Sequence, residues 1–475
     1  MQNLLSRSNT VPLLVACALF MEHLDSTIIA TTLPQIARSM QEDPLRLSLA
    51  ITSYLLSLAV FIPLSGWAAD RFGPKRIFRS AIVLFTIGSI LCGLSQSLMQ
   101  LVAARILQGI GGAMMVPVGR LVLLRQVPKS DLVRVLAYVT MPAVLAPIIG
   151  PPLGGFIASH TSWRWIFFVN VPIGIIGYLL AARFIAGGPE RDVPRLDFLG
   201  WVLIGSGLAS LLFGFENLGR NVFDAAVVRT FLLGGFALIG IYVLRSRRLA
   251  HPIVDLSLLQ VPTFAIAMLC GIFFRIGVGA QALLMPLLLQ LGFGLTPLQS
   301  GLTTCAGAVG IFLMKPTATP IVRRFGFRRV LTINGILCGL LIAGCATFSL
   351  ATPHWLMVGY LLLLGYLQSL QFTAMNAMSF ADISERGMSQ AASFSSTTIQ
   401  LSLSMGVGIA AQLLHFSVSS SNRTTIQADD FWMAFLSFGT CTVLSAFLYR
   451  RLAATAGSTV SGHAAEAGSL RKLGS

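Results

Sequence analysis

Apolar stretches of about twenty residues, separated by short polar joints, recur along almost the whole chain. A helix that rises about 1.5 Å per residue needs roughly 20 apolar residues to cross the hydrocarbon core of a bilayer. We therefore predict an all-α integral membrane protein with fourteen transmembrane helices. The expected spans lie near residues 11–33, 47–69, 79–98, 101–124, 137–159, 165–186, 197–215, 228–246, 263–285, 298–320, 330–350, 355–378, 392–416 and 431–450.

The spacing of the spans groups them as six, two and six. We expect an N-terminal six-helix bundle at 1–186, two additional linking helices at 187–250 and a C-terminal six-helix bundle at 251–452. The segment 453–475 is rich in Ala, Ser and Gly and is expected to be a disordered tail. The linking helices have no copy in either bundle, so we expect them to pack outside both.

Composition and charge agree with a membrane protein. Hydrophobic residues make up 55% of the chain and charged residues 11%, where soluble proteins have about 25% charged residues. The net charge of +16 fits either a nucleic-acid-binding surface or cationic loops beside a membrane. Of the 33 Lys and Arg residues, 23 fall in loops on the side of the N-terminus, six fall on the opposite side and four lie inside spans. This bias places both termini in the cytoplasm and excludes a nucleic-acid partner, because the charge forms no single face.

Motifs for catalysis or metal binding are missing from the sequence. None of the four lysines follows a glycine, so the chain has no GxxxxGK[ST] phosphate-binding loop. The six histidines form no HExxH spacing, and the seven cysteines form no CxxC pair. We therefore expect no enzyme, no cofactor, no metal site and no disulfide framework. The first apolar stretch lacks a small-residue cleavage site, which indicates a retained span.

Two loops share a tight glycine turn flanked by basic residues. The loop after the second span reads Gly66-Trp-Ala-Ala-Asp70-Arg71-Phe-Gly73-Pro-Lys75-Arg76, and the loop after the tenth reads Arg323-Arg324-Phe325-Gly326-Phe-Arg328-Arg329. Gly73 and Gly326 are 253 positions apart, and each loop follows the second span of its own six-helix block. Such internal symmetry is typical of transporters built from two repeated bundles that rock about a central site.

Together with four further motifs, the first loop resembles the major facilitator superfamily. Gly66-x3-Asp70-Arg71-x-Gly73-x-Lys75-Arg76 resembles the loop 2–3 signature of that family, and Arg105-x2-Gln108-Gly109-x-Gly111-Gly112-Ala113 resembles its buried-arginine motif. Gly150-Pro151-Pro-Leu-Gly154-Gly155 is similar to its exporter motif. Leu24-Asp25-Ser-Thr27-Ile-Ile-x3-Leu33-Pro34 and Trp163-Arg164-Trp165-Ile-Phe-Phe-x-Asn170-x-Pro172 resemble its fourteen-span drug:proton antiporter branch. The resemblance covers essentially the whole chain.

The resemblance implies a proton-coupled exporter of the bacterial inner membrane, with two bundles of the major facilitator fold. Its partners would be protons, a small-molecule substrate and the lipid bilayer, and the proton gradient would be its only energy source. We expect a monomer. Three positions depart from the family pattern: Ala146 replaces a glycine, Ala30 replaces an asparagine and Arg323 stands where the first loop has Asp70. A switch role for that acid is therefore restricted to the first half.

Glu22 and Asp25 are the two acids that lie well inside a span. Their spacing of three residues puts them on one face of a helix, and buried acids in membrane proteins usually face the bundle interior. Burial and mutual repulsion are expected to let at least one of them take up a proton near neutral pH. Arg105 shares the outer half of the bundle with Asp25 and is the natural partner. In the family this arginine is associated with proton transfer; the alternative is a fixed link between helices.

Three more basic residues lie inside spans. Arg275 is about halfway along the ninth span, so it either pairs with Glu22 or Asp25 or binds a substrate anion. Arg120 and Lys315 lie near cytoplasmic ends, so we expect their side chains to reach the membrane surface without a special role.

A mixed polar and aromatic group is a candidate for substrate binding. An amide, aromatic and thioether surface can accommodate varied organic ligands, although plain helix packing uses the same residues. The candidates are Arg275, Gln281, Gln368, Gln371, Phe372, Met375 and Asn376.

Two further motifs have a mechanical interpretation. Asp70, Arg71, Gly73 and Lys75 are expected to form a cytoplasmic latch that bonds helix ends in one state and releases them in the other. Small residues and prolines in the fifth span favour close packing and bending at an outer gate, or else a rigid kink. The gating candidates there are Gly150, Pro151, Gly154 and Gly155.

The sequence leaves the charge of the substrate open. Two buried acids suit cationic drugs, whereas four cations inside spans suit an anion such as a carboxylate metabolite, citrate or iron-citrate. A membrane sensor that kept the fold without transport is a third, more distant alternative.

Overall fold

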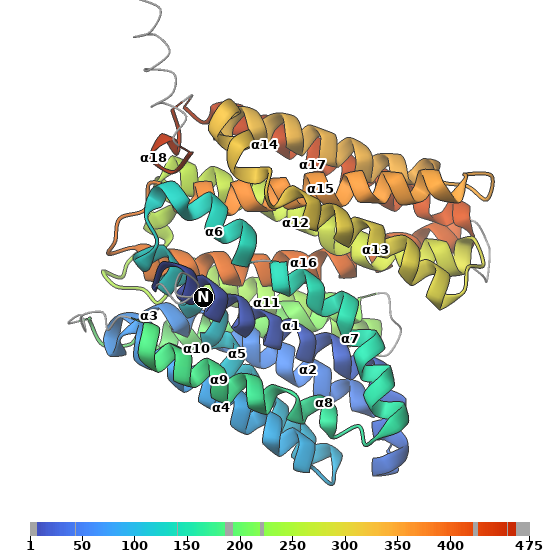
Figure 1. Ribbon diagram of the computed structural model, residues 1–475, viewed down its shortest axis with the longest axis horizontal. Helices are drawn as coiled ribbons and strands as arrows, with labels where there is room; N and C mark the ends of the chain where they lie inside the picture. The colour runs from blue at the N-terminus through green and yellow to red at the C-terminus, as the bar shows by residue number, and fades with distance from the viewer. Residues whose placement is uncertain are drawn as a thin grey trace, which may run out of the picture.

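The computed structural model describes residues 7–42, 44–139, 141–185, 193–218, 223–420, 426–453 and 455–461. All regular elements in these ranges are helices, and the long ones run side by side (Figure 1). Long helices are the expected solution for an apolar chain, because backbone N–H and C=O groups in hydrocarbon must be paired within the segment itself.

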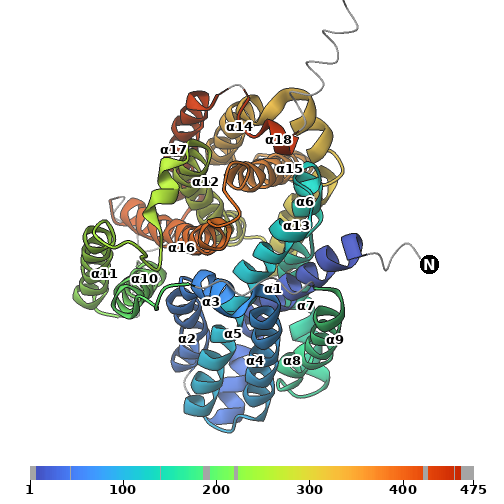
Figure 2. The same ribbon diagram turned by 90° about the vertical axis from the view of Figure 1, so that its left-hand side faces the viewer.

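The first half of the chain forms one helical bundle, seen at the bottom of Figure 2. Within it, α4 packs on α5, α1 on α7, and α2 on α5. Its helices are α1 (Arg7–Met40), α2 (Pro44–Phe61), α3 (Leu64–Phe72), α4 (Pro74–Leu94), α5 (Leu98–Gln126), α6 (Leu132–Val139), α7 (Met141–His160), α8 (Trp165–Phe168) and α9 (Asn170–Phe184).

The last part of the chain forms a second bundle, at the top of Figure 2. Here α13 packs on α15, α12 on α16, and α14 on α17. Its helices are α12 (Pro262–Leu287), α13 (Pro297–Met314), α14 (Ala318–Gly344), α15 (His354–Ser379), α16 (Met388–Ser420), α17 (Trp432–Phe447) and the short α18 (Ser458–Ser461).

Two helices lie beside the bundles, α10 (Phe198–Asn217) and α11 (Ala225–Ser246). They pack on each other, and α10 also contacts α2 of the first bundle and α16 of the second. The indole nitrogen of Trp201 donates a hydrogen bond of 2.9 Å to the carbonyl of Val60 on α2. Figure 2 places this pair at the edge of the molecule, where we expected linking helices.

The two halves share a backbone feature that supports a duplicated architecture. Gly73, between α3 and α4, has φ 82° and ψ 138°, and Gly326, at a kink inside α14, has φ 72° and ψ 158°. Residues with a side chain rarely adopt this positive-φ conformation, so both turns favour a glycine. The matching loops therefore make the same turn, and α14 corresponds to α3 and α4 joined.

The count of fourteen spans is only partly supported. Among the described residues, eleven helices are long and apolar enough to cross a bilayer. The bent pair of Leu49–Phe61 and Leu64–Phe72, which meet at 58°, would make a twelfth. Outside this set are two helices that correspond to expected spans, α7 with 20 residues and α13 with 18.

The bundles meet at the end of the molecule that carries both glycine turns. There α3 and α5 contact α16, and α6 contacts α15. The hydroxyl of Ser393 on α16 donates a hydrogen bond of 2.8 Å to the carbonyl of Ile62, next to the break between α2 and α3. These contacts join the two halves at the end of the molecule that carries the basic glycine-turn loops.

The start of the expected disordered tail is ordered and crosses between the halves. Residues 455–461 turn into α18, which contacts α14 of the second bundle as well as α6 and its preceding turn in the first. Val460 is 1% exposed, and it belongs to the same apolar cluster as Leu136 and Phe327. The composition suggested disorder because Ala, Ser and Gly dominate, but Val460 and Ala456 of this segment pack against the apolar cluster. Residues 454 and 462–475 lie outside the described part of the chain.

Candidate functional site

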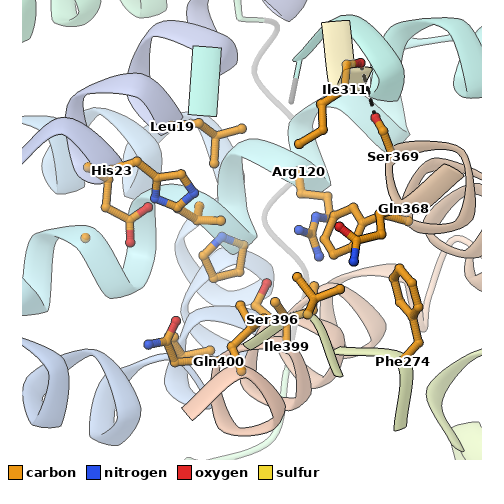
Figure 3. A pocket seen from close by; sticks show the side chains of 18 of the residues that line it. Leu19, His23, Arg120, Phe274, Ile311, Gln368, Ser369, Ser396, Ile399 and Gln400 are labelled. Carbon is orange, nitrogen blue, oxygen red and sulfur yellow. Dashed lines mark hydrogen bonds between the residues drawn. The ribbon is translucent and has the colours of Figure 1, made fainter. Parts of the chain in front are cut away.

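A cavity of about 310 Å³ lies between the two bundles (Figure 3). Its walls come from α1, α5 and the break after α2 in the first bundle, and from α12, α13, α15 and α16 of the second. Most of the wall is apolar, with a few polar groups, as is usual for sites that bind small organic molecules. The lining residues are Leu19, Glu22, His23, Ile62, Gly112, Val116, Pro117, Arg120, Phe274, Val278, Ile311, Lys315, Gln368, Ser369, Phe372, Ser396, Ile399, Gln400 and Leu403.

Charged side chains of both signs line this cavity. Glu22 is 9% exposed, and its buried Oε2 atom has no hydrogen-bond partner in the part of the chain that the structure describes. Arg120 comes from α5, and its Nη1 atom donates a hydrogen bond of 3.3 Å to the hydroxyl of Ser395 in the other bundle. Lys315 follows α13 and is 3% exposed. A buried carboxylate oxygen without a partner, such as that of Glu22, is costly in a low-dielectric interior and marks a candidate functional position.

The expectation that Arg120 and Lys315 reach the membrane surface is wrong. Both side chains line the cavity between the bundles. The distance of Arg120 from a helix end did not predict where its side chain points. Because α5 extends to Gln126, Arg120 lies inside the helix, and it lines the cavity together with residues of α1 and α16. His23 is a further cavity residue that sequence reasoning missed, although its position beside Glu22 was a usable signal.

Asp25 lies in a separate network inside the first bundle. Its carboxylate forms an ion pair with Arg105, and both side chains are fully buried. The side-chain amides of Gln108 and Asn170 donate hydrogen bonds of 2.8 Å and 2.9 Å to its Oδ1 atom. Ser89 accepts hydrogen bonds from the same two amides. Nearly every polar group in this network has a hydrogen-bond partner. A buried network of this kind makes the bundle rigid.

Three sequence motifs converge on this network. Asp25 belongs to the first-span motif, Arg105 and Gln108 to the fourth-span motif, and Asn170 to the sixth-span motif. The guanidinium of Arg105 also lies 4.2 Å from the ring centre of Tyr54 and donates to the carbonyl of Ala50 at 3.1 Å. The predicted proximity of Asp25 and Arg105 is therefore observed. Gln108 and Asn170 stood in the motifs, but sequence gave them no role.

Arg275 has neither of the partners that sequence suggested. Its side chain is 0% exposed, and all three guanidinium nitrogens lack a hydrogen-bond partner in the described part of the chain. The guanidinium lies 5.9 Å from the ring centre of Phe372, whose side chain lines the cavity. Arg275 therefore stands behind the cavity wall and not on its surface.

The other substrate-binding candidates divide into two groups. Gln368 and Phe372 line the cavity, and the amide of Gln368 donates a hydrogen bond of 2.6 Å to Gln281 behind it. Gln371 instead accepts from Asn334 at 2.9 Å and donates to a backbone carbonyl, so it ties α15 to α14.

Two further candidates lie at the margins of the main cavity. Met375 is buried in the second bundle, near Gly271 and Arg275. Asn376 lines a small neighbouring cavity of about 30 Å³ that it shares with Arg120.

The latch candidates lie where the bundles meet. Asp70 accepts a hydrogen bond of 3.0 Å from Arg125 and a short hydrogen bond from the hydroxyl of Ser389, near the start of α16. A carboxylate is favoured at a helix N-terminus by the helix dipole. Arg71 is exposed and Lys75 is partly exposed on the turn around Gly73. Arg125 and Ser389 were not identified from the sequence.

The fifth-span motif brings α7 close to α1. Gly150 and Gly154 are buried, and a side chain at Gly150 would collide with the hydroxyl of Thr27 on α1. The packing of α7 against the Thr27 side chain therefore disfavours any larger residue at position 150. The side chains of Pro151 and Gly155 lie outside the described residues.

The chain belongs to the Major Facilitator Superfamily, whose family description matches residues 15–282 and 267–473. Because this family consists of transporters, the protein is a membrane transporter and not an enzyme.

The chain is similar over most of its length to curated proteins named "Putative multidrug resistance protein MdtD". The protein of Pectobacterium atrosepticum is 38% identical over 446 residues, which cover 92% of this chain and 94% of the relative. The protein of Salmonella heidelberg is 38% identical over 419 residues, covering 86% and 88%. The resemblance inferred from the motifs is thereby confirmed.

Two solved structures share the fold at low sequence identity. The proton:xylose symporter XylE has a TM-score of 0.65 at 14% identity, with 96% of this chain and 98% of that chain covered. The human organic anion transporter MFSD10 has a TM-score of 0.63 at 15% identity, with 93% and 99% covered. At such identities the comparison shows the fold alone.

Proposed function

We propose that this protein is a proton-coupled secondary active exporter, a drug:proton antiporter that moves small amphipathic compounds out of the cytoplasm by alternating access. The observation that carries the proposal is Glu22, a buried acid whose Oε2 atom has no hydrogen-bond partner among the described residues, in a cavity formed by both bundles. An acid in that position can hold either a proton or a substrate group, and exchange requires such competition.

In this mechanism the two acids have different tasks. Glu22 loses its proton to the cytoplasm, binds substrate and regains a proton from the outer side, which expels the substrate outward. Asp25 and Arg105 hold α1 against α5 in the present arrangement. A proton that reached Asp25 would remove one charge of that pair and weaken the contact between these helices. Proton uptake would thus be linked to movement of α1, which carries Glu22.

The proposed setting is the bacterial inner membrane, with fourteen spans and both termini in the cytoplasm. The excess of basic residues on the side of the N-terminus supports this orientation. The latch at Asp70 and the crossing of α18 would then close the cytoplasmic end. One chain provides both bundles and the cavity, so we propose that the monomer is the transporting unit.

Export of an anionic metabolite or a metal chelate such as iron-citrate is a second candidate function. The specific observation in its favour is that Arg120 and Lys315 line the cavity, so basic residues there outnumber the single acid.

Transport into everted membrane vesicles tests proton-driven export. A lipophilic cation, citrate and a zwitterionic aromatic compound are offered separately, with the proton gradient intact or collapsed by an uncoupler. We expect gradient-dependent uptake of at least one compound, and loss of that uptake in Glu22→Gln. Uptake that persists unchanged after the gradient collapses contradicts the proposal.

A further inference from the structure

Tyr54 on α2 has a buried hydroxyl that the packing of the first bundle does not use. Its side chain is 1% exposed, and within the described residues its Oη atom has no hydrogen-bond partner. A buried hydroxyl of this kind has lost its hydration without compensation, so its presence calls for a partner that another state of the protein supplies.

The ring of Tyr54 rests on the buried ion pair of the first bundle. The centre of the Arg105 guanidinium lies 4.2 Å from the ring centre, and Arg105 pairs with Asp25. The Nη2 atom of Arg105 has no hydrogen-bond partner in the described part of the chain. The electron-rich face of the ring therefore contributes to the stabilisation of this buried charge.

The hydroxyl end of Tyr54 lies close to the cavity. A Cβ atom at Gly112 on α5 would stand 3.1 Å from the hydroxyl oxygen, and Gly112 lines the same cavity as Glu22. Because position 112 has no side chain, the hydroxyl lies just behind a bare part of the cavity wall. Tyr54 thus extends from the Asp25–Arg105 pair to the edge of the cavity.

Glu22 is the acceptor that matches this donor. Its Oε2 atom is buried and, among the described residues, has no hydrogen-bond partner. The Tyr54 hydroxyl interacts electrostatically with Glu22, Asp25 and Arg105, and the helices α1 and α2 are in contact. A phenol hydroxyl can donate and an ionised carboxylate can only accept, and a hydrogen bond to a charged acceptor is one of the stronger kinds.

We infer that Tyr54 is a positioning residue of the proton site: its hydroxyl donates a hydrogen bond to Glu22 when that carboxylate is ionised, while its ring stays on Arg105. The hydrogen bond forms as Glu22 loses its proton and breaks as Glu22 regains it. Through Tyr54, the ionisation of Glu22 then affects the Asp25–Arg105 pair, which holds α1 against α5. This inference rests on the proposed role of Glu22 in proton exchange.

Other charged groups face Glu22, and their effect must be kept apart from that of the hydroxyl. The cavity walls from α12, α15 and α16 contribute uncharged side chains. The charged and titratable groups around Glu22 are His23, Asp25, Arg105, Arg120 and Lys315, with Arg275 behind Phe372. Tyr54→Phe leaves all of these groups in place and removes one oxygen atom.

The protonation of Glu22 can be measured without any ligand or gradient, in the purified full-length protein in lipid nanodiscs. Infrared difference spectra over a pH titration record the carbonyl stretch of protonated carboxyl groups, and the band of Glu22 is the one lost in Glu22→Gln. Tyr54→Phe keeps the ring and removes the donor to the ionised form. We expect the midpoint of the Glu22 band to move to higher pH by about one to two units, the range that corresponds to a hydrogen bond with a charged group.

Tyr178→Phe is the matched control. Tyr178 lies on α9 of the same bundle, its ring centre is 4.5 Å from the Arg79 guanidinium, and its hydroxyl accepts a hydrogen bond from Arg79. This residue is not part of the cavity wall, so the midpoint should equal that of the parent. Replacement of Tyr54 by 3-fluorotyrosine, a stronger donor of nearly the same size, should move the midpoint to lower pH.

The link to the ion pair is tested by combining two substitutions. Because Tyr54 interacts with both Glu22 and Arg105, the midpoint shifts caused by Tyr54→Phe and Asp25→Asn should not add in the double variant. Additive shifts would show that Tyr54 acts on Glu22 alone and would overturn the link.

Two further outcomes overturn the inference: a midpoint in Tyr54→Phe that stays or moves to lower pH, or an equal shift in Tyr178→Phe. Either result leaves proton-driven export standing, because Glu22 still binds a proton in the parent. If no carboxyl band depends on Glu22, the proton role of Glu22 fails and this inference fails with it. Conversely, the expected shift together with gradient-independent uptake contradicts the exporter and retains the hydrogen bond.

Discussion

Glu22 and Asp25 are one helical turn apart on α1, yet they have opposite surroundings. Asp25 is 1% exposed and accepts hydrogen bonds from Arg105, Gln108 and Asn170. Glu22 lines the cavity, and its buried Oε2 atom has no hydrogen-bond partner among the described residues. Two acids on one helix face therefore differ in their surroundings: Asp25 holds helices of the first bundle together, whereas Glu22 faces the cavity.

Neutralising each acid separates these roles. Asp25→Asn removes one partner of a buried ion pair, which costs about 3–5 kcal/mol of unfolding free energy, because the Arg105 charge stays buried. Glu22→Gln removes an unpaired carboxylate and should not lower the melting temperature. We expect both variants to lose proton-driven transport, with a lower melting temperature for Asp25→Asn alone. Equal melting temperatures for the two variants would contradict this division of roles.

At the level of single residues, the sequence identified the buried charged side chains better than it identified their contacts. The shared depth of Asp25 and Arg105 in the outer half of the bundle followed from the direction of two spans, whereas their separation did not. The partners Ser89, Gln108 and Asn170 could not be assigned because hydrogen bonding among four helices depends on their rotation about their axes. The same reason explains Arg120, whose depth along α5 is visible in the sequence but whose facing direction is not.

Among the elements, α3 and α16 form the polar link between the bundles at the end with the basic loops. Asp70 bonds Arg125 within its own bundle and Ser389 in the other. The second half has a matching turn at Gly326, but Arg323 stands where the first half has the acid. The two halves therefore share the backbone turn, but only the first half has the acid that forms the latch.

Removing the latch should open this end of the molecule. In a background without native cysteines, Gln400→Cys reports entry of a hydrophilic maleimide into the cavity of everted vesicles. We expect Asp70→Ala and Ser389→Ala each to raise the labelling rate several-fold, and the double variant to add little, because each change removes the hydrogen bond between Asp70 and Ser389 that joins the bundles.

Asp197→Asn provides the matched control for this latch. It breaks an ion pair of 2.7 Å with Arg245 between the linking helices; Asp197 lines the same small cavity as Asp70, but this ion pair does not join the two bundles. Its labelling rate should equal that of the parent. Additive effects of the two latch substitutions, or an equal effect of the control, would contradict the latch.

The short segment that includes α18 also joins the halves. Val460 is buried among side chains of α6 and α14, and burial of one valine is worth about 1.5–3 kcal/mol. A chain that ends after Ala453 should therefore melt at a lower temperature than one that ends after Ser461. The longer truncation should melt like the full chain. Identical melting of all three would show that the segment contributes nothing to stability.

For the whole molecule, the pattern of apolar stretches was a reliable guide to architecture. The helical class, the two bundles and the matching glycine turns follow from span length and from the repeat of the loop motif. The number of spans could not be settled in the same way, because α2 and α3 bend by 58° within one stretch and α13 has only 18 helical residues. The cavity was not predictable, since it is created by the contact of two bundles whose relative placement is not a local property of either.

The central claim is that substrate and proton exchange at Glu22 in the cavity between the bundles. The most direct measurement uses purified protein in proteoliposomes without an imposed gradient, with a pH-sensitive dye inside. Addition of an outward gradient of a transported compound should move protons inward in the parent, and Glu22→Gln should move none while it still binds lipid and melts normally. Proton movement in Glu22→Gln equal to that of the parent, or substrate flux without any proton movement in the parent, would contradict the account.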